Sequence, residues 1–195
     1  MSDIAVPLTK ESRRTQVNAT LGMVFFVGSW AMAFGTLFLS FLVIRDRQPA
    51  WPPEGVALPS VTMAGLGTAV LLISSLVLHQ SVKRGRQGRA GFVGLWAVGL
   101  ALALVFAAIQ TWLWTDVWTA GGRPRSGVYE GLFYMLTWFH ALHVLTGIVA
   151  LLVIQFGAMS GKFGAARISP VSSVAIFWHF VDVVWLILFL GFFVF

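Results

Sequence analysis

Five apolar stretches, separated by short polar connections, constrain the fold of this chain more than any other feature. A membrane-spanning helix needs about 20 predominantly apolar residues to cross the hydrocarbon core of a bilayer. The stretches cover residues 21–44, 61–82, 90–118, 128–159 and 171–195 approximately. Only 10% of the residues are charged, whereas a soluble domain carries about 25%. The pattern predicts an all-α membrane protein built as a bundle of five transmembrane helices.

The polar residues 1–20 contain no short apolar core followed by small residues, which a cleavable secretory signal would show. We therefore expect an N-terminal tail over residues 1–20, followed by a single membrane domain over residues 21–195 whose first helix also serves as the insertion signal. The chain has no cysteine, which excludes disulfides, thiolate metal sites and a covalently attached c-type haem.

The 13 lysines and arginines divide unevenly between the two ends of the predicted bundle. Nine lie in the N-terminal tail and in the connections after the second and fourth stretches, and four lie in the other two connections. Positively charged loops stay in the cytoplasm. The N-terminus is therefore predicted to be cytoplasmic and the C-terminus to lie outside, and the net charge of +6 reflects topology rather than nucleic-acid binding.

The last apolar stretch carries two ionisable residues near its midpoint, in the segment Trp178-His-Phe-Val-Asp-Val-Val-Trp185. A charged side chain at this depth costs about 2.5–3.5 kcal/mol on insertion scales, so such residues face protein and have a partner. In a helix His179 and Asp182 lie on one face, and Trp178, Asp182 and Trp185 form a stripe at i, i+4 and i+7. This face is predicted to contact protein rather than lipid.

Two further histidines, His140 and His143, lie three residues apart in the fourth stretch and share a face. Together with His179 and Asp182 they could supply imidazole and carboxylate ligands to a metal. They could equally form a buried hydrogen-bonding network. A third reading is a small b-type cytochrome that holds haem between His143 and His179. The residues alone leave these readings open.

Three other positions are notable. His79 lies toward the cytoplasmic end of the second stretch and is interpreted as an interfacial residue. Gln110 is a polar residue inside an apolar helix and is predicted to form a hydrogen bond to another helix. Gly147, one turn after His143, is expected to permit close approach of a neighbouring helix.

The chain resembles subunit III of the haem–copper terminal oxidases, in the short five-helix form of bacterial cytochrome c and quinol oxidases. The segments Phe139-His-Ala-Leu-His-Val-Leu-Thr-Gly147 and Phe177-Trp-His-Phe-Val-Asp-Val-Val-Trp185 are similar to the most specific motifs of the family. The resemblance extends over essentially the whole chain. It also includes Arg45, Trp51-Pro-Pro-Glu-Gly55, Ser74-Ser75 and Gln110.

The resemblance implies an accessory subunit of an oxygen-reducing, proton-pumping complex, with no catalytic, cofactor-binding or metal-binding residues of its own. Haems and copper would lie in the partner subunits I and II, and a small subunit IV is a further candidate partner. The subunit would bind phospholipid, support proton uptake and reside in the bacterial inner (plasma) membrane.

The resemblance also assigns structural roles to individual residues. The histidine and aspartate motifs are then interpreted as a buried network that holds the fourth and fifth helices together. The motif positions are His140, His143, Gly147, Trp178, His179, Asp182, Trp185 and Gln110. Candidate lipid contacts are Trp51, Arg45 and His79.

The chain departs from the family at two buried glutamates, whose positions are occupied by Trp30 and Leu113. Any role of those carboxylates therefore does not transfer to this chain. Cytochrome c oxidase is the preferred assignment, and a subunit III-like component of a quinol oxidase or a nitric oxide reductase is the alternative within the family.

Overall fold

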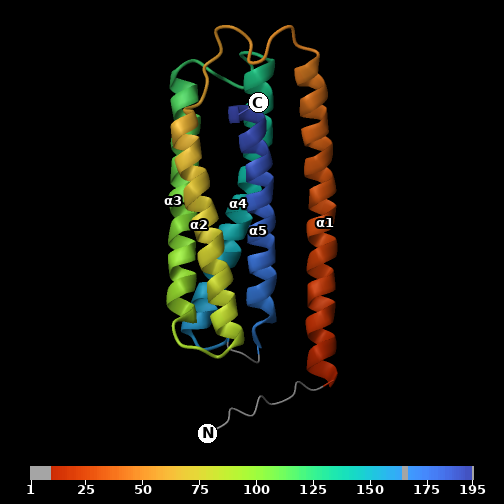
Figure 1. Ribbon diagram of the computed structural model, residues 1–195, viewed down its shortest axis with the longest axis vertical. Coiled ribbons are helices and arrows are strands. Elements are labelled where there is room, and N and C mark those ends of the chain that lie inside the picture. Colours follow the sequence, from red (N-terminus) through yellow and green to blue (C-terminus); the bar gives the residue numbers. More distant parts are fainter. Residues whose placement is uncertain (1–9, 164–166, 195) are drawn as a thin grey trace.

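The computed structural model describes residues 10–163 and 167–194, which form five long antiparallel helices (Figure 1). They are α1 (Lys10–Asp46), α2 (Val61–Arg86), α3 (Phe92–Thr119), α4 (Val128–Met159) and α5 (Ser169–Phe189), and α5 continues into a π-helical turn, η2 (Leu190–Val194). All five are long and apolar enough to cross a membrane. The predicted fold class, an all-α bundle of five transmembrane helices, is confirmed.

Helix α5 lies at the centre of the bundle and α1 at its edge. In Figure 1, α2, α3, α4 and α5 form one group, and α1 stands at the side of α5. Helix α5 contacts α1, α2 and α4. Half of the most apolar window of α5 is buried inside the protein, against 11% of the corresponding window of α1. Helix α1 therefore exposes a long apolar surface.

The helix ends differ from the apolar stretches in ways that the flanking residues explain. Helix α1 begins at Lys10, inside the segment expected to be a tail, because polar residues continue a helix readily once it leaves the hydrocarbon. Residues 1–9 of the expected tail lie outside the described residues. Helix α2 extends to Arg86, where basic side chains suit the negative end of the helix dipole. Helix α5 begins at Ser169 with Pro170 in its first turn, a position that proline favours.

Helices α2 and α3 are joined by small residues and by hydroxyl groups. The Ser74 hydroxyl donates to the backbone oxygen of Gly99 at 2.8 Å, and the Ser81 hydroxyl donates to that of Phe92 at 2.7 Å. A Cβ atom at Gly99 would lie 2.6 Å from the Leu78 side chain, so only glycine fits there. Close approach with interhelical hydrogen bonds is how helices associate in a membrane, where burial from water gives no driving force.

The buried side chains form two clusters along the bundle. One contains the fully buried Trp96, Trp178 and Trp185 between α2, α3, α4 and α5. The other lies near the start of α4, where Tyr129 and Phe133 pack with residues of α1 and η2. The first cluster surrounds the polar residues of the sequence motifs.

Candidate functional site

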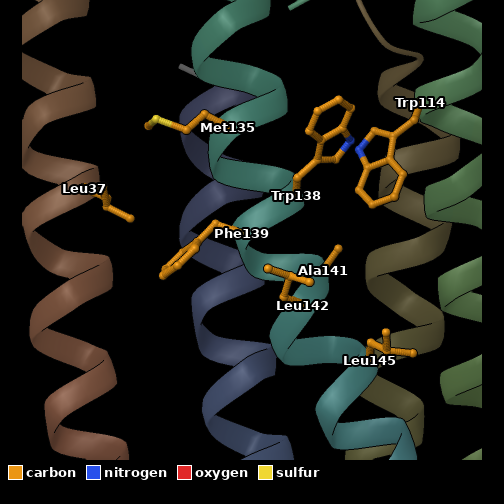
Figure 2. Close-up of a pocket in the computed structure, with 8 residues that line it drawn as sticks. All are labelled: Leu37, Trp114, Met135, Trp138, Phe139, Ala141, Leu142 and Leu145. Carbon is orange, nitrogen blue, oxygen red and sulfur yellow. The ribbon is translucent and has the colours of Figure 1, made fainter.

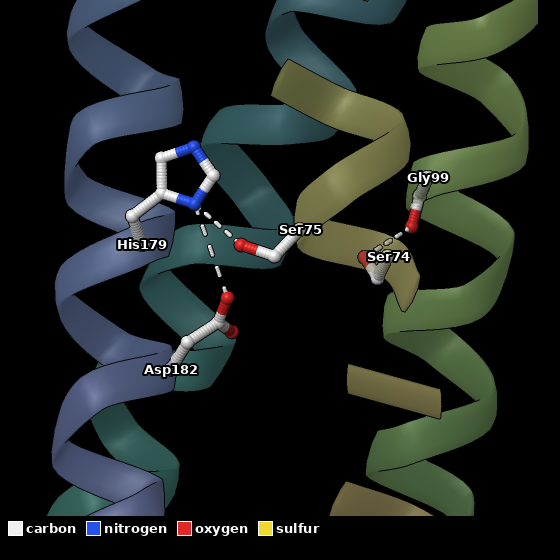
Figure 3. A network of polar contacts seen from close by, with 5 residues as sticks. All are labelled: Ser74, Ser75, Gly99, His179 and Asp182. Atoms are coloured by element: carbon white, nitrogen blue, oxygen red, sulfur yellow. Dashed lines mark hydrogen bonds and ion pairs between the residues drawn. The ribbon is translucent and has the colours of Figure 1, made fainter. Parts of the chain in front are cut away.

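The polar residues of α5 are bonded to α2. His179 and Asp182 lie one turn apart on α5, and their Nδ1 and Oδ2 atoms are 4.0 Å from each other. The Ser75 hydroxyl of α2 shares a hydrogen bond with the same His179 nitrogen (Figure 3). The neighbouring Ser74 points the other way, to Gly99 of α3. The cluster therefore connects α5 to α2, while the adjacent serine connects α2 to α3.

Asp182 is deeply buried and its carboxylate is sparsely supported. It is 4% exposed, and neither carboxylate oxygen has a hydrogen-bond partner within the described part of the chain. The His179 side chain is 38% exposed, and its ring lies 6.0 Å from that of His79 on α2, measured between centroids. The cluster thus runs from the exposed His79 through His179 to a carboxylate in the interior.

The two tryptophans of the motif hold α5 against different neighbours. The Trp185 indole N–H donates to the Thr68 hydroxyl of α2 at 2.9 Å. Trp178 lies over Gly147 of α4, where a Cβ atom would be 2.8 Å from a ring carbon. A hydrogen bond therefore holds the Trp185 side chain in place. The Trp178 side chain fits closely against α4 because the facing residue has no side chain.

His140 and His143 have different surroundings although they share a helix face. The His143 ring meets the rings of Trp30 and Phe34 on α1, with centroids 4.3 and 4.9 Å away, and its Nδ1 bonds the Phe139 carbonyl oxygen at 2.8 Å. His140 stacks on Trp185 of α5 with centroids 5.7 Å apart, and its ring also lies 6.3 Å from that of Phe34 on α1. Both histidines therefore contact α1 through Phe34, and His140 contacts α5 as well.

These ring contacts do not fit a shared metal or haem site. Among the described residues, no group of three or more histidine, cysteine, aspartate or glutamate side chains is arranged to hold a metal ion. The contacts of His143 are with α1 and α4, whereas those of His179 are with α2 and with Asp182 of its own helix. A haem bridging His143 and His179 would have to displace both sets of contacts. The donor arrangement disfavours the metal and cytochrome readings.

The expectation of a hydrogen-bonded network between the fourth and fifth helices requires correction. The hydrogen bonds from α5 side chains in this region reach α2, at Ser75 and Thr68. Contact between α4 and α5 is made by rings, through His140 on Trp185 and Trp178 on Gly147. The physical reason is the short distance between the two helices. The close approach at Gly147 leaves room for ring packing but places no hydrogen-bond acceptor of the described residues opposite the Trp178 indole nitrogen.

Gln110 does not form the predicted interhelical hydrogen bond. Its side chain is buried, yet both amide atoms lack a hydrogen-bond partner in residues 10–163 and 167–194. It lies beside a cavity of about 280 Å³ between α3 and α4, which His140 also lines. The prediction is wrong because the hydrogen-bonding side chain that α4 offers beside this cavity, that of His140, is not bonded to Gln110.

The three candidate lipid contacts are not brought together. Trp51, in the connection between α1 and α2, packs on Phe41 and Tyr129 with ring centroids 5.7 and 5.2 Å away. Arg45 lies in the last turn of α1 beside an open cavity of about 620 Å³. His79 is exposed in the second half of α2. Trp51 is partly engaged within the protein, and the lipid contact of all three residues stays a prediction.

Two positions that matter in the structure were not identified as site residues. Thr68 accepts the hydrogen bond from Trp185. The sequence pattern that could have identified it is its seven-residue spacing from Ser75, which places both hydroxyls on one side of α2. Trp30 stands at a position where the resemblance leads us to expect a glutamate, and its indole contacts His143 edge-on. The other such position, Leu113, is fully buried in the core. Both positions are therefore used for packing inside the bundle.

Comparison with known proteins gives a consistent result. Residues 7–195 match the family described as "Cytochrome c oxidase subunit III". The chain is 34% identical over 171 residues to cytochrome c oxidase subunit 3 of Thermostichus vulcanus, covering 87% of this chain and 83% of the relative. It is 29% identical over 192 residues to the protein of the same name from Corynebacterium diphtheriae, covering 96% of this chain and 93% of the relative. The similarity spans all five helices.

Proposed function

The chain belongs to the cytochrome c oxidase subunit III family, and we propose that it is a non-catalytic subunit that stabilises the catalytic subunit and supports its proton uptake. It is an accessory subunit of a haem–copper oxidase and a multi-pass protein of the bacterial inner membrane. The match over residues 7–195 carries the proposal.

The contacts of the motif residues support a structural role for them. His140 and His143 are engaged by rings of the bundle, Trp178 lies against Gly147, and Trp185 is held by a hydroxyl of α2. Residues used in this way position helices and are not free to bind a substrate. The same positions are proposed to hold the face of the bundle in the shape that the catalytic subunit recognises.

The proposed partners are subunits I and II, a small subunit IV, and phospholipid, with haems and copper held by the partner subunits. The exposed apolar side of α1 supports an interaction within the membrane, because side chains such as Phe25, Met32 and Leu39 are largely exposed. Exposed contiguous apolar surface marks a protein or membrane contact. Arg45 and His79 are proposed to contact lipid headgroups.

The test is to purify the oxidase with and without this subunit and to follow its activity during sustained turnover. Both preparations are expected to contain the same haem and copper per catalytic subunit and to start at similar rates. The preparation without the subunit is expected to lose activity sooner. Loss of haem or copper in proportion to the missing subunit would show that this chain holds a redox centre and would contradict the proposal.

A further inference from the structure

His79 of α2 and His179 of α5 bring two imidazole rings together at the contact between these helices. The ring centroids are 6.0 Å apart and the ring planes meet at 51°. His79 is exposed and the His179 side chain is 38% exposed, whereas His140 and His143 are buried. The two accessible histidines of the chain therefore lie beside each other on different helices.

Polar contacts orient the His179 ring. The Ser75 hydroxyl shares a hydrogen bond with Nδ1, and the Asp182 Oδ2 atom lies 4.0 Å from the same nitrogen. Figure 3 shows the other ring nitrogen, Nε2, on the side of the ring away from both partners. A carboxylate beside Nδ1 favours the tautomer with its proton on that atom. The lone pair of Nε2 is then available to a ligand on the accessible side.

This arrangement is typical of metal-binding histidines. A metal-ligating imidazole almost always directs its second nitrogen to a carboxylate, a carbonyl or water, which fixes the ring and makes the ligating nitrogen more basic. Zinc binds imidazole nitrogen at about 2.0–2.1 Å, so two imidazoles on one zinc ion have centroids roughly 5–6.5 Å apart. The separation of the His79 and His179 rings falls within this range.

The position of the pair suits an ion that arrives from water. His79 lies seven residues before Arg86, the last residue of α2, which is about 10 Å along the helix axis. Lys83, one turn beyond His79, is exposed, and its flexible stem lets the ammonium group extend away into the aqueous phase. The two imidazoles are therefore close to the polar end of α2.

The rest of the surface along the bundle offers a different kind of contact. The groove of about 740 Å³ along α4 is lined by side chains such as Met135, Trp138 and Leu142, and by no imidazole or carboxylate (Figure 2). Imidazole and carboxylate are the ligands that zinc finds in a chain without cysteine. A zinc ion would therefore find its donors at the contact between α2 and α5, and not along α4.

We propose that His79 and His179 bind a zinc ion through one ring nitrogen each, with water in the remaining coordination positions. Asp182 and Ser75 orient His179 and do not touch the ion. The ion links α2 to α5 near the polar end of α2. The second ring nitrogen of His79 remains for the proposed headgroup contact.

This site is distinct from the group of His140, His143, His179 and Asp182 considered above. It uses neither buried histidine, and Asp182 supports a ligand instead of being one. With two protein ligands it is smaller than the groups of three that are absent from the described residues. Zinc has no redox chemistry, so the proposal adds no redox centre and does not depend on the accessory role, although it departs from the expectation of a chain without metal-binding residues.

The test uses the intact complex in nanodiscs after treatment with a chelator. Diethylpyrocarbonate modifies accessible imidazole nitrogens, and mass spectrometry of the α2 and α5 peptides measures its reaction with His79 and His179 separately. Both histidines are expected to react in the metal-free complex. Zinc chloride is expected to protect both over the same concentration range, and magnesium chloride should protect neither, because magnesium prefers oxygen ligands.

His79→Gln is the decisive variant. It is expected to abolish zinc protection of His179, because one imidazole alone does not hold the ion. Gln80→Ala is the matched control, since Gln80 is the exposed neighbour of His79 on α2, and protection of His179 should be unchanged. Asp182→Asn should raise the zinc concentration needed for protection about 10–100-fold, the usual effect of losing a residue that orients a ligand.

Three results would overturn the proposal. They are histidines that do not react in the metal-free complex, a lack of protection by zinc, and protection of His179 that persists in His79→Gln. The last result would identify an adventitious ion only. Haem content and activity lifetime, measured on the same samples, report on the accessory role and so distinguish its failure from that of the zinc site.

Discussion

Asp182 is the residue whose environment most needs explanation. It is buried inside a membrane-spanning helix, with the His179 ring nitrogen at 4.0 Å and no hydrogen bond to either oxygen in the residues described. Intramembrane acids are retained where they face protein and have a partner. The structure supplies one partner on the same helix, and the Ser75 hydroxyl joins that partner to α2. Asp182, His179 and Ser75 therefore form one polar cluster at the contact between α5 and α2.

Replacing Asp182 tests this role. Asp182→Asn keeps the shape of the side chain and replaces a carboxyl oxygen with an amide NH₂, so the polar contact with His179 weakens. We expect the bundle to lose about 1 kcal/mol of stability, seen as a shorter activity lifetime of the complex, with unchanged haem absorbance in the assembled fraction. Glu54→Gln makes the same chemical change in an exposed connection and should have no effect. Loss of a haem band from fully assembled Asp182→Asn complex would contradict the structural role.

The two motif tryptophans give a second test at this scale. Trp185→Phe removes the hydrogen bond to Thr68 and leaves that buried hydroxyl without its donor. The loss should lower the free energy of unfolding by about 1 kcal/mol. This effect adds to that of the smaller ring volume. Trp178→Phe should lower stability only through the smaller volume of the ring, because the Trp178 indole nitrogen has no hydrogen-bond partner among the residues described. The measurement is the midpoint of denaturation for both variants and for each combined with Thr68→Val. Only Trp185→Phe should be non-additive with Thr68→Val.

Among the helices, the contact between α4 and α5 depends on one small residue. A Cβ atom at Gly147 would lie 2.8 Å from the Trp178 ring, and Trp178 is fully buried and cannot move aside. The ring packing of His140 on Trp185 lies on the same pair of helices. The distance between α4 and α5 is therefore set by Gly147.

Gly147→Val should force these helices apart. Overpacking of this kind costs about 1–3 kcal/mol, so the variant is expected to reduce the yield of assembled complex and lower its denaturation temperature. Gly65→Ala on α2 is the control, because nothing lies within 4 Å of a Cβ atom there and alanine favours helix. A Gly147→Val complex as stable as the unmodified one would show that the two helices are not in close contact.

The sequence predicts the helices much better than it predicts their polar contacts. Hydrophobic length specifies five spans, and the three-residue spacing of His179 and Asp182 correctly places them together. The separate surroundings of His140 and His143, the unpaired Gln110 and the acceptor role of Thr68 could not be predicted. Each depends on the rotation and spacing of neighbouring helices. Helices that are apolar on nearly every face carry little information on how they rotate against each other.

For the whole molecule, the arrangement of termini and loops bears on orientation. Helix α1 begins at one end of the bundle and η2 ends at the other (Figure 1). The connection between α2 and α3 therefore lies at the end where α1 begins, and the connection between α3 and α4 lies at the opposite end. The excess of basic residues at the first of these ends predicts that it faces the cytoplasm.

The absence of cysteine allows this orientation to be measured directly. Gln87→Cys places a thiol between α2 and α3, and Ser126→Cys places one between α3 and α4. With a membrane-impermeant maleimide added to intact spheroplasts, only Ser126→Cys should react, and in inverted vesicles only Gln87→Cys should react. The reverse pattern would invert the proposed topology.

The central claim, that this chain is an accessory subunit without a redox centre of its own, is tested most directly by visible spectroscopy. Reduced-minus-oxidised spectra would be recorded for the chain purified alone and for the complex that a tag on the chain isolates. The chain alone should be colourless, and the complex should show the bands of a haem- and copper-containing partner. A haem band in the isolated chain, abolished by replacing His143 or His179 with alanine, would contradict the account.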